Sequence, residues 1–155
     1  MTPIIRIPLF FVLAMLAHWW WTTHFTFSGI APQLLLVLTL AIAARYGPIR
    51  AMCMGFGWGL FLDTMSAHLF GANALALTLA GYSTGSIRRW VDVAGLPSQC
   101  LLVFAMTWIY FLFLGVLGAL FMKQFLWVGW LPFLADPLYN CLAAAAVSVS
   151  WMDYK

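Results

Sequence analysis

Long apolar stretches separated by short breaks run along the whole chain. They predict six helices, at residues 5–22, 31–45, 48–65, 70–87, 98–121 and 131–151. No stretch alternates polar and apolar residues with a period of two, which favours helices over a β-barrel. Four of the five breaks contain a glycine and a proline: Gly29 and Pro32, Gly47 and Pro48, Gly95 and Pro97, and Gly129 and Pro132. We therefore expect one all-α domain over residues 1–155.

Composition indicates where these helices lie. Hydrophobic residues make up 65% of the chain and charged residues 7%, and the mean hydropathy is +0.99. Too few polar residues remain to cover a water-soluble surface. We therefore predict an integral membrane protein, a compact bundle of six transmembrane helices. The first stretch ends at Trp19 to Trp21 and lacks a small-residue cleavage site, so we interpret it as a retained helix with an interfacial anchor.

The basic residues predict the orientation of the bundle. With an even number of spans, one side holds six of the seven lysines and arginines: Arg6, Arg45, Arg50, Arg88, Arg89 and Lys155. The opposite side holds only Lys123, with Trp127 and Trp130. Lysine and arginine are retained in cytoplasmic loops. We therefore predict that both termini are cytoplasmic.

Two acidic residues fall inside the predicted spans, where an ionisable group is costly and indicates a functional site. Asp63 lies near the outer end of the third span and Asp136 near the outer end of the sixth. Asn140 shares a helix face with Asp136, four residues before it. With His68 and Asn73 at similar depth, these side chains could form one polar cluster facing the outer leaflet. The alternative is that both carboxyl groups simply lie at the level of the lipid headgroups.

Small residues at helical spacing predict close helix packing. Gly55 and Gly59 precede Asp63 at four-residue intervals, so a stripe of the third span should face protein. Gly81 and Gly85 repeat the spacing in the fourth span, and Ala144 lies in an alanine run, 143–146, in the sixth. Six spans in so short a chain should not bury all three small faces. We therefore expect at least one to accept a helix of a partner protein.

No enzymatic, metal or cofactor site is expected. Ser83 lies in a Gly-Tyr-Ser-Thr-Gly match to a nucleophile elbow, but in a membrane helix and without a histidine on its side of the bilayer. The histidines lack metal-ligand spacing. The cysteines at 53, 100 and 141 have no paired spacing, so we interpret them as isolated core residues. The small, dispersed net charge of +3 argues against nucleic-acid binding.

Several motifs resemble the family of the rod shape-determining protein MreD. They are the run from Ala31 and Pro32 through Gln33 to Val37, then Arg45-Tyr46-Gly47, the glycine-rich segment 55–63 that ends in Asp63, and Leu69-Phe70-Gly71 followed by 74–77. The resemblance implies a non-enzymatic scaffold of the bacterial inner membrane that serves cell elongation, rod shape and lateral peptidoglycan synthesis. It implies direct binding of MreC, with RodA, a class B penicillin-binding protein and MreB in the wider complex.

The resemblance also supplies an alternative function. The family is similar in architecture to the substrate-binding subunits of energy-coupling-factor vitamin transporters, which have an outward-facing pocket. In that case Asp63, Asp136 and nearby aromatic side chains would bind a small solute. A transporter subunit should enclose a pocket of several hundred cubic ångströms, about the size of common ligand sites. A scaffold should instead show an apolar groove between its helices.

Overall fold

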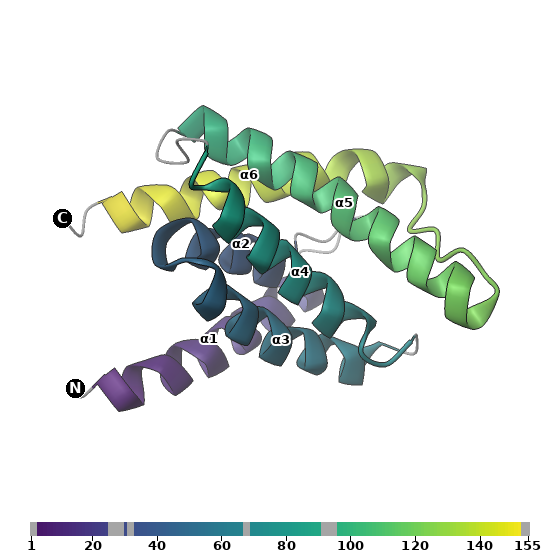
Figure 1. The fold of residues 1–155 in the computed structure, drawn as a ribbon, viewed down its shortest axis with the longest axis horizontal. Helices are drawn as coiled ribbons and strands as arrows, with labels where there is room; N and C mark the ends of the chain where they lie inside the picture. The colour runs from purple at the N-terminus through teal and green to yellow at the C-terminus, as the bar shows by residue number, and fades with distance from the viewer. Residues whose placement is uncertain (1–2, 25–29, 31–32, 67–68, 91–95, 153–155) are drawn as a thin grey trace.

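The computed structural model describes residues 3–24, 30, 33–66, 69–90 and 96–152, and over these residues the protein is all-helical. The helices, in chain order, are α1 (Pro3–His24), α2 (Leu34–Tyr46), α3 (Pro48–Met65), α4 (Ala72–Ile87), α5 (Leu96–Met122) and α6 (Trp130–Met152) (Figure 1). Each begins and ends within three residues of the helix expected from the apolar pattern. The expectation of an all-α fold with six helices is confirmed.

Length and apolarity single out one of these helices. Within the described ranges, Pro97–Met122 is the one stretch that is both long and apolar enough to cross a bilayer by itself. Leu34–Tyr46 is also apolar but shorter. Polar residues lower the hydropathy of other helices: α3 contains Arg50 and Asp63, and α4 contains Asn73.

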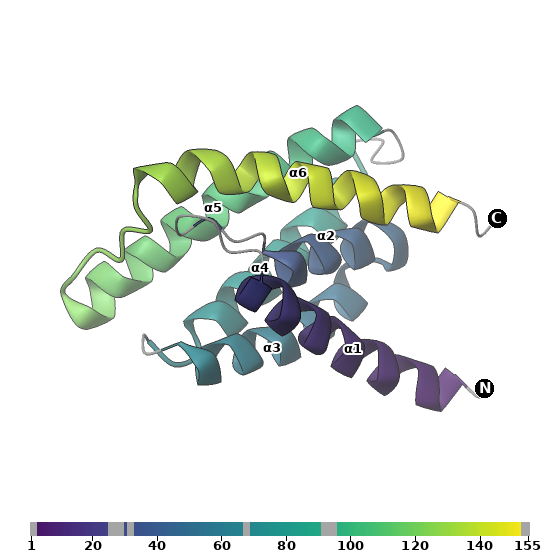
Figure 2. The same ribbon diagram turned by 180° about the vertical axis from the view of Figure 1, so that it is seen from behind.

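Helix α2 is the centre of the molecule and contacts every other helix. Seven of its 13 residues are buried, including Leu35, Leu36 and Leu40. At 1.5 Å per residue it is about 20 Å long, shorter than the roughly 30 Å hydrocarbon core of a bilayer. Its short length is compatible with a membrane because protein surrounds it. Figure 2 shows α2 behind α1 and α6.

Helices α3 and α4 form the closest pair because their glycines interlock. A Cβ at Gly59 would lie 2.3 Å from the Cα of Ala74 in α4. In the other direction, a Cβ at Gly85 would lie 2.5 Å from the Cα of Pro48 in α3. Gly55 likewise faces the backbone of α4, with the carbonyl oxygen of Leu77 2.9 Å from the position of an added Cβ. Neither helix could carry side chains at these positions without moving the other.

The two glycine faces are thus used inside the protein. The glycine stripes of α3 and α4 pack on each other, and Ala144 is 7% exposed in the common core. The two glycine faces are complementary and cover each other. The alanine run is only partly buried, with Ala146 exposed and Ala143 and Ala145 half-buried, so the expectation that six helices cannot bury all three small faces stays a prediction.

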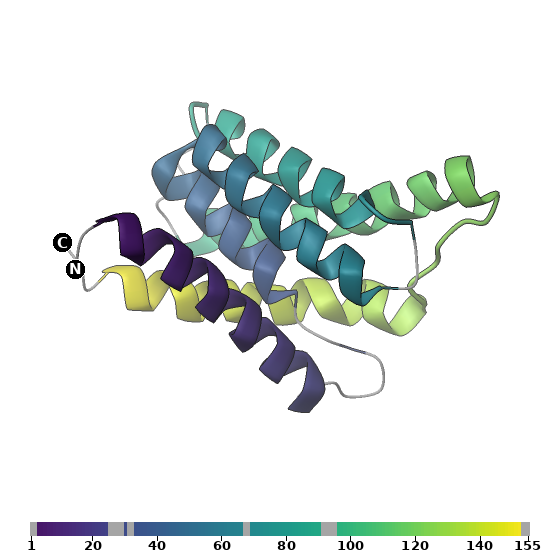
Figure 3. The same ribbon diagram turned by 90° about the horizontal axis from the view of Figure 1, so that it is seen from below.

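Successive helices run back and forth, so the connections alternate between the two ends of the bundle. Figure 3 shows the start of α1, the turn between α2 and α3, the end of α4 and the end of α6 at one end. The turn between α3 and α4 and the segment between α5 and α6 lie at the other. Arg45, Arg50, Arg88 and Arg89 belong to the first end, and Lys123 follows α5 at the second.

Candidate functional site

Asp63 is a buried carboxylate that accepts three hydrogen bonds. Its side chain is 2% exposed. Oδ1 accepts hydrogen bonds from the backbone N–H (3.0 Å) and the side-chain amide (2.9 Å) of Asn73, and Oδ2 accepts one from the backbone N–H of Ala74 (3.1 Å). These are the second and third residues of α4, whose N-cap is Gly71. Asp63 of α3 therefore caps α4, a role usually played by a residue of the same helix.

The glycine at the start of α4 explains why the cap comes from another helix. Gly71 has a φ of +93° and no side chain to offer to the first turn of α4. Gly59, one turn before Asp63, lets the backbone of α4 approach closely enough for the carboxylate to reach it. Gly59 thus allows the close packing that brings Asp63 within reach of the start of α4. The expectation that this stripe faces protein is met by α4.

The same contacts extend to α5. The hydroxyl group of Tyr110 donates a hydrogen bond to Oδ1 of Asn73. Tyr110 is 6% exposed, so this bond lies inside the bundle. Three helices are therefore connected in series through Asp63, Asn73 and Tyr110, which we call the α3–α4–α5 polar cluster.

A second buried group connects α2, α5 and α6. Asn140 is fully buried, and its Oδ1 accepts a hydrogen bond of 2.8 Å from the backbone N–H of Gln33, the N-cap residue of α2. Its amide donates to Oγ1 of Thr107 at 3.2 Å, and Thr107 donates to the carbonyl of Val103. Asn140 therefore binds the start of α2 as Asp63 binds the start of α4. The starts of α2 and α4 are therefore each hydrogen-bonded by a polar side chain from another helix.

The structure brings the predicted polar residues into two groups instead of one. Asp63 lies with Asn73, and Asn140 lies with Gln33 and Thr107; the groups meet α5 one turn apart, at Tyr110 and Thr107. Asp136 is 3% exposed, one turn before Asn140. His68 falls outside the described residues. Both carboxyl groups are buried in protein, and the alternative that they lie at the level of the lipid headgroups stays open.

Two tryptophans near the middle of predicted spans are packed side chains. Trp58 is fully buried, stacks on Phe11 at 5.7 Å and donates its indole N–H to the Phe11 carbonyl at 3.2 Å. Trp108 stacks on Phe133 and donates to its carbonyl at 3.0 Å. Each ring therefore joins two helices through its face and its one donor.

The structure pairs two of the cysteines, which the sequence interpretation took as isolated. The thiol of Cys141 in α6 lies 3.1 Å from the carbonyl oxygen of Cys100 in α5, and the thiol of Cys100 lies 4.0 Å from the carbonyl of Cys141. That interpretation is wrong for this pair, because the two residues face each other across packed helices. Cys53 is exposed on α3.

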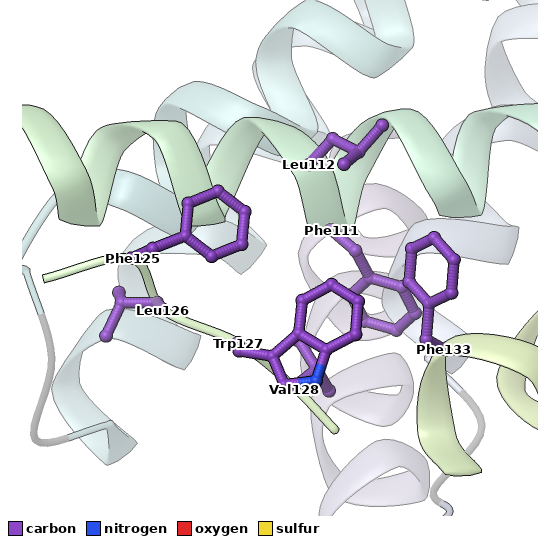
Figure 4. Close-up of a pocket in the computed structure, with 7 residues that line it drawn as sticks. All are labelled: Phe111, Leu112, Phe125, Leu126, Trp127, Val128 and Phe133. Atoms are coloured by element: carbon purple, nitrogen blue, oxygen red, sulfur yellow. The ribbon is translucent and has the colours of Figure 1, made fainter. Parts of the chain in front are cut away.

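A shallow apolar hollow lies where α5 meets the segment that leads to α6 (Figure 4). It has essentially no room for a water molecule; the empty space of about 190 Å³ between its side chains includes space open to the surroundings. The segment folds back because glycines of α5 leave room: added Cβ atoms at Gly115 and Gly118 would lie within 2.5 Å of Phe125 and Leu126 side-chain atoms. The lining is Phe111, Leu112, Phe125, Leu126, Trp127, Val128 and Phe133.

The fold and the buried polar contacts together define the class of protein. It is an all-helical bundle in which the buried polar side chains described above bind helix starts and one another, so their chemistry is that of structural connections. The chain belongs to the family of the rod shape-determining protein MreD, whose family model matches residues 2–152. That family is membrane-associated and acts in determining rod shape.

No curated protein and no solved structure matches the chain. The predicted likeness to vitamin-transporter subunits therefore has no support from a known structure and stays a prediction. What the family match adds to the geometry is a cellular context, the machinery that determines rod shape.

Proposed function

We propose that this chain is a non-enzymatic, multi-pass scaffold of the bacterial inner membrane that binds MreC and supports cell elongation and lateral peptidoglycan synthesis. The single observation that carries the proposal is the family match over residues 2–152. The buried contacts agree with it, because Asp63, Asn73, Tyr110 and Asn140 are engaged in holding helices together. No cofactor enters this proposal.

The proposed topology has six spans and cytoplasmic termini. Support comes from the alternation of helix ends, which gathers the arginines near α2, α3 and α4 at one end of the bundle (Figure 3). Retention of arginine on the cytoplasmic side would orient that end inward. The outer end then carries the apolar segment between α5 and α6, with Trp127 and Trp130 exposed as interfacial side chains should be.

MreC would bind an outward apolar face, because both glycine faces are occupied inside the bundle. Helix α5 offers such a face along its whole length. The residues of this face are all exposed and follow one another at intervals of three or four: Leu101, Ala105, Ile109, Leu112, Val116 and Leu120. We call this the α5 outer stripe. Intervals of three and four are those by which one helix packs along another, so a single-span partner fits it. RodA, a class B penicillin-binding protein and MreB would join through the wider complex.

The test asks whether the purified chain retains MreC and which residues of the chain MreC contacts. The full chain, tagged and extracted in mild detergent, should retain MreC, and a photo-crosslinking residue in place of Ile109 should give an adduct with it. The same residue in place of Leu77, which is fully buried, is the matched control and should give none. Failure to retain MreC with every variant and with the unmodified chain would overturn the proposal.

The transporter alternative is tested on the same purified chain. It needs a pocket of several hundred cubic ångströms near Asp63 and Asp136. The shallow hollow described above lies elsewhere, on apolar side chains only, and has essentially no room for a water molecule, so it does not favour this alternative. Tight binding of a vitamin-sized solute by the chain alone, without retention of MreC, would replace the scaffold proposal.

A further inference from the structure

Three helices end close together at the arginine-rich end of the bundle. Gly85 in the last turn of α4 packs on Pro48 in the first turn of α3. Beyond α4, Nη1 of Arg88 donates a hydrogen bond of 3.0 Å to the carbonyl of Ala44 in the last turn of α2. These two contacts hold the end of α4 against the start of α3 and the end of α2, so Arg50, two residues after Pro48, and Arg88 belong to the same end of the bundle.

Two guanidinium groups lie near the ring of Tyr46. The guanidinium carbon of Arg50 lies 5.5 Å from the centre of the Tyr46 ring, and that of Arg45 lies 6.0 Å from it. The ring attracts each cation, but it holds two like charges near one another. Tyr46, Arg45, Arg50 and Arg88 are all exposed, so a ligand can reach them. We call these four residues the Tyr46 basic cluster.

Basic residues outnumber acidic residues at this end of the chain's helices. In the part of the chain that the structure describes, neither Arg50 nor Arg88 contacts a carboxylate. Asp92 and Asp153, which follow α4 and α6 and lie outside the described residues, are the two acidic residues nearest this end in sequence. Six lysines and arginines at this end still exceed two acidic residues. An anion at the Tyr46 basic cluster would relieve the repulsion.

We propose that the Tyr46 basic cluster binds the phosphate group of an anionic phospholipid of the surrounding membrane. Guanidinium groups suit phosphate because each can donate two parallel hydrogen bonds. The neighbouring side chains suit the rest of a lipid molecule: Ile49 is 76% exposed and Trp90 is 90% exposed, and exposed aromatic rings favour the headgroup region. The inference rests on the proposed insertion in a membrane and is independent of MreC.

The experiment titrates the purified full chain in detergent with phosphatidylglycerol and, separately, with zwitterionic phosphatidylcholine, and measures bound lipid by native mass spectrometry. The unmodified chain should retain phosphatidylglycerol preferentially. Arg50→Gln and Arg88→Gln should each weaken that retention about fivefold, since one basic residue near an anionic lipid surface is worth about 1 kcal/mol. Arg50→Lys should keep part of it, because the charge remains while the paired donors are lost.

Matched controls separate a site from a general attraction. Arg89→Gln removes the same charge next to Arg88, from an exposed residue outside the cluster, and Lys123→Gln removes one at the opposite end; both should retain phosphatidylglycerol as the unmodified chain does. Equal losses in Arg89→Gln and Arg88→Gln would overturn the site in favour of the overall charge. Complete displacement of the lipid by millimolar inorganic phosphate would overturn the choice of a lipid.

Three outcomes bear on this inference and on the proposed function. Retention of neither phospholipid would overturn membrane insertion and the site together. Retention of phosphatidylglycerol that depends on Arg50 and Arg88, in a chain that does not retain MreC, would support the site and overturn the scaffold. Equal retention of both phospholipids by every variant would overturn the site alone.

Discussion

Replacement of Asp63 by asparagine should destabilise the bundle while keeping the size of the side chain. The carboxylate accepts three hydrogen bonds, from the backbone and side chain of Asn73 and the backbone of Ala74. An asparagine oxygen could retain the two bonds from Asn73. Its NH₂ group would then face the N–H of Ala74, so that buried donor would lose its acceptor.

The expected magnitude follows from the bonds that change. A hydrogen bond to a charged group contributes about 1.5–3 kcal/mol, and a buried donor left unsatisfied costs about 1–3 kcal/mol. These two figures describe overlapping effects, so we expect Asp63→Asn to lower the free energy of unfolding by about 2–3 kcal/mol. Asp63→Leu removes all three bonds and should cost more. Both variants should still insert in the membrane, because each removes an ionisable group.

The assay is reversible unfolding of the purified chain in mixed detergent micelles, followed by the fluorescence of its nine tryptophans. Thr64→Ala is the matched control, since Thr64 is the next residue and is exposed. An unchanged unfolding midpoint for Asp63→Asn would refute the capping role. Unchanged stability together with loss of MreC would show instead that the carboxylate contacts the partner.

Three further predictions concern contacts between other helices. Gly59→Ala should prevent normal packing of α3 on α4, since its Cβ would lie 2.3 Å from a backbone atom; reduced yield of folded monomer, compared with Cys53→Ala on the exposed face of α3, would measure this. Tyr110→Phe should lower unfolding stability by about 1–2 kcal/mol because it removes one buried hydrogen bond; an unchanged midpoint would contradict this. Mild oxidation with copper phenanthroline should link Cys100 to Cys141, detected by peptide mapping without reductant. A link that includes Cys53 would contradict the packing of α5 on α6.

The sequence predicts the helices well for a simple physical reason. A long apolar stretch limits where a helix can begin and end, and each observed helix begins and ends within three residues of its predicted bounds. Asp63 could also be recognised, because an acid at the end of a glycine stripe is unusual enough to require a partner. Its position four residues after Gly59 already indicated that it faces another helix.

The contacts of the second polar group could not be predicted in the same way. Asn140 binds the backbone of Gln33, 107 residues away in the sequence, and the pair Cys100 and Cys141 is separated by 41 residues. Such contacts depend on how α5 and α6 are rotated and shifted against each other. Apolar periodicity is nearly absent in α5, which is hydrophobic on all sides, so the sequence contains little information about that rotation.

The interlocking of α3 and α4 changes how a partner can be sought by mutation. Gly59 and Asp63 act on the same two turns of α4, so a bulky residue at Gly59 would displace both the backbone contact and the cap. Loss of MreC from a Gly59→Leu variant would therefore follow from local unfolding as readily as from a blocked surface. A substitution on the α5 outer stripe, such as Ile109→Ala, leaves every described hydrogen bond in place. If the partner binds there, its loss from such a variant, at unchanged unfolding stability, assigns the interface without disturbing the scaffold.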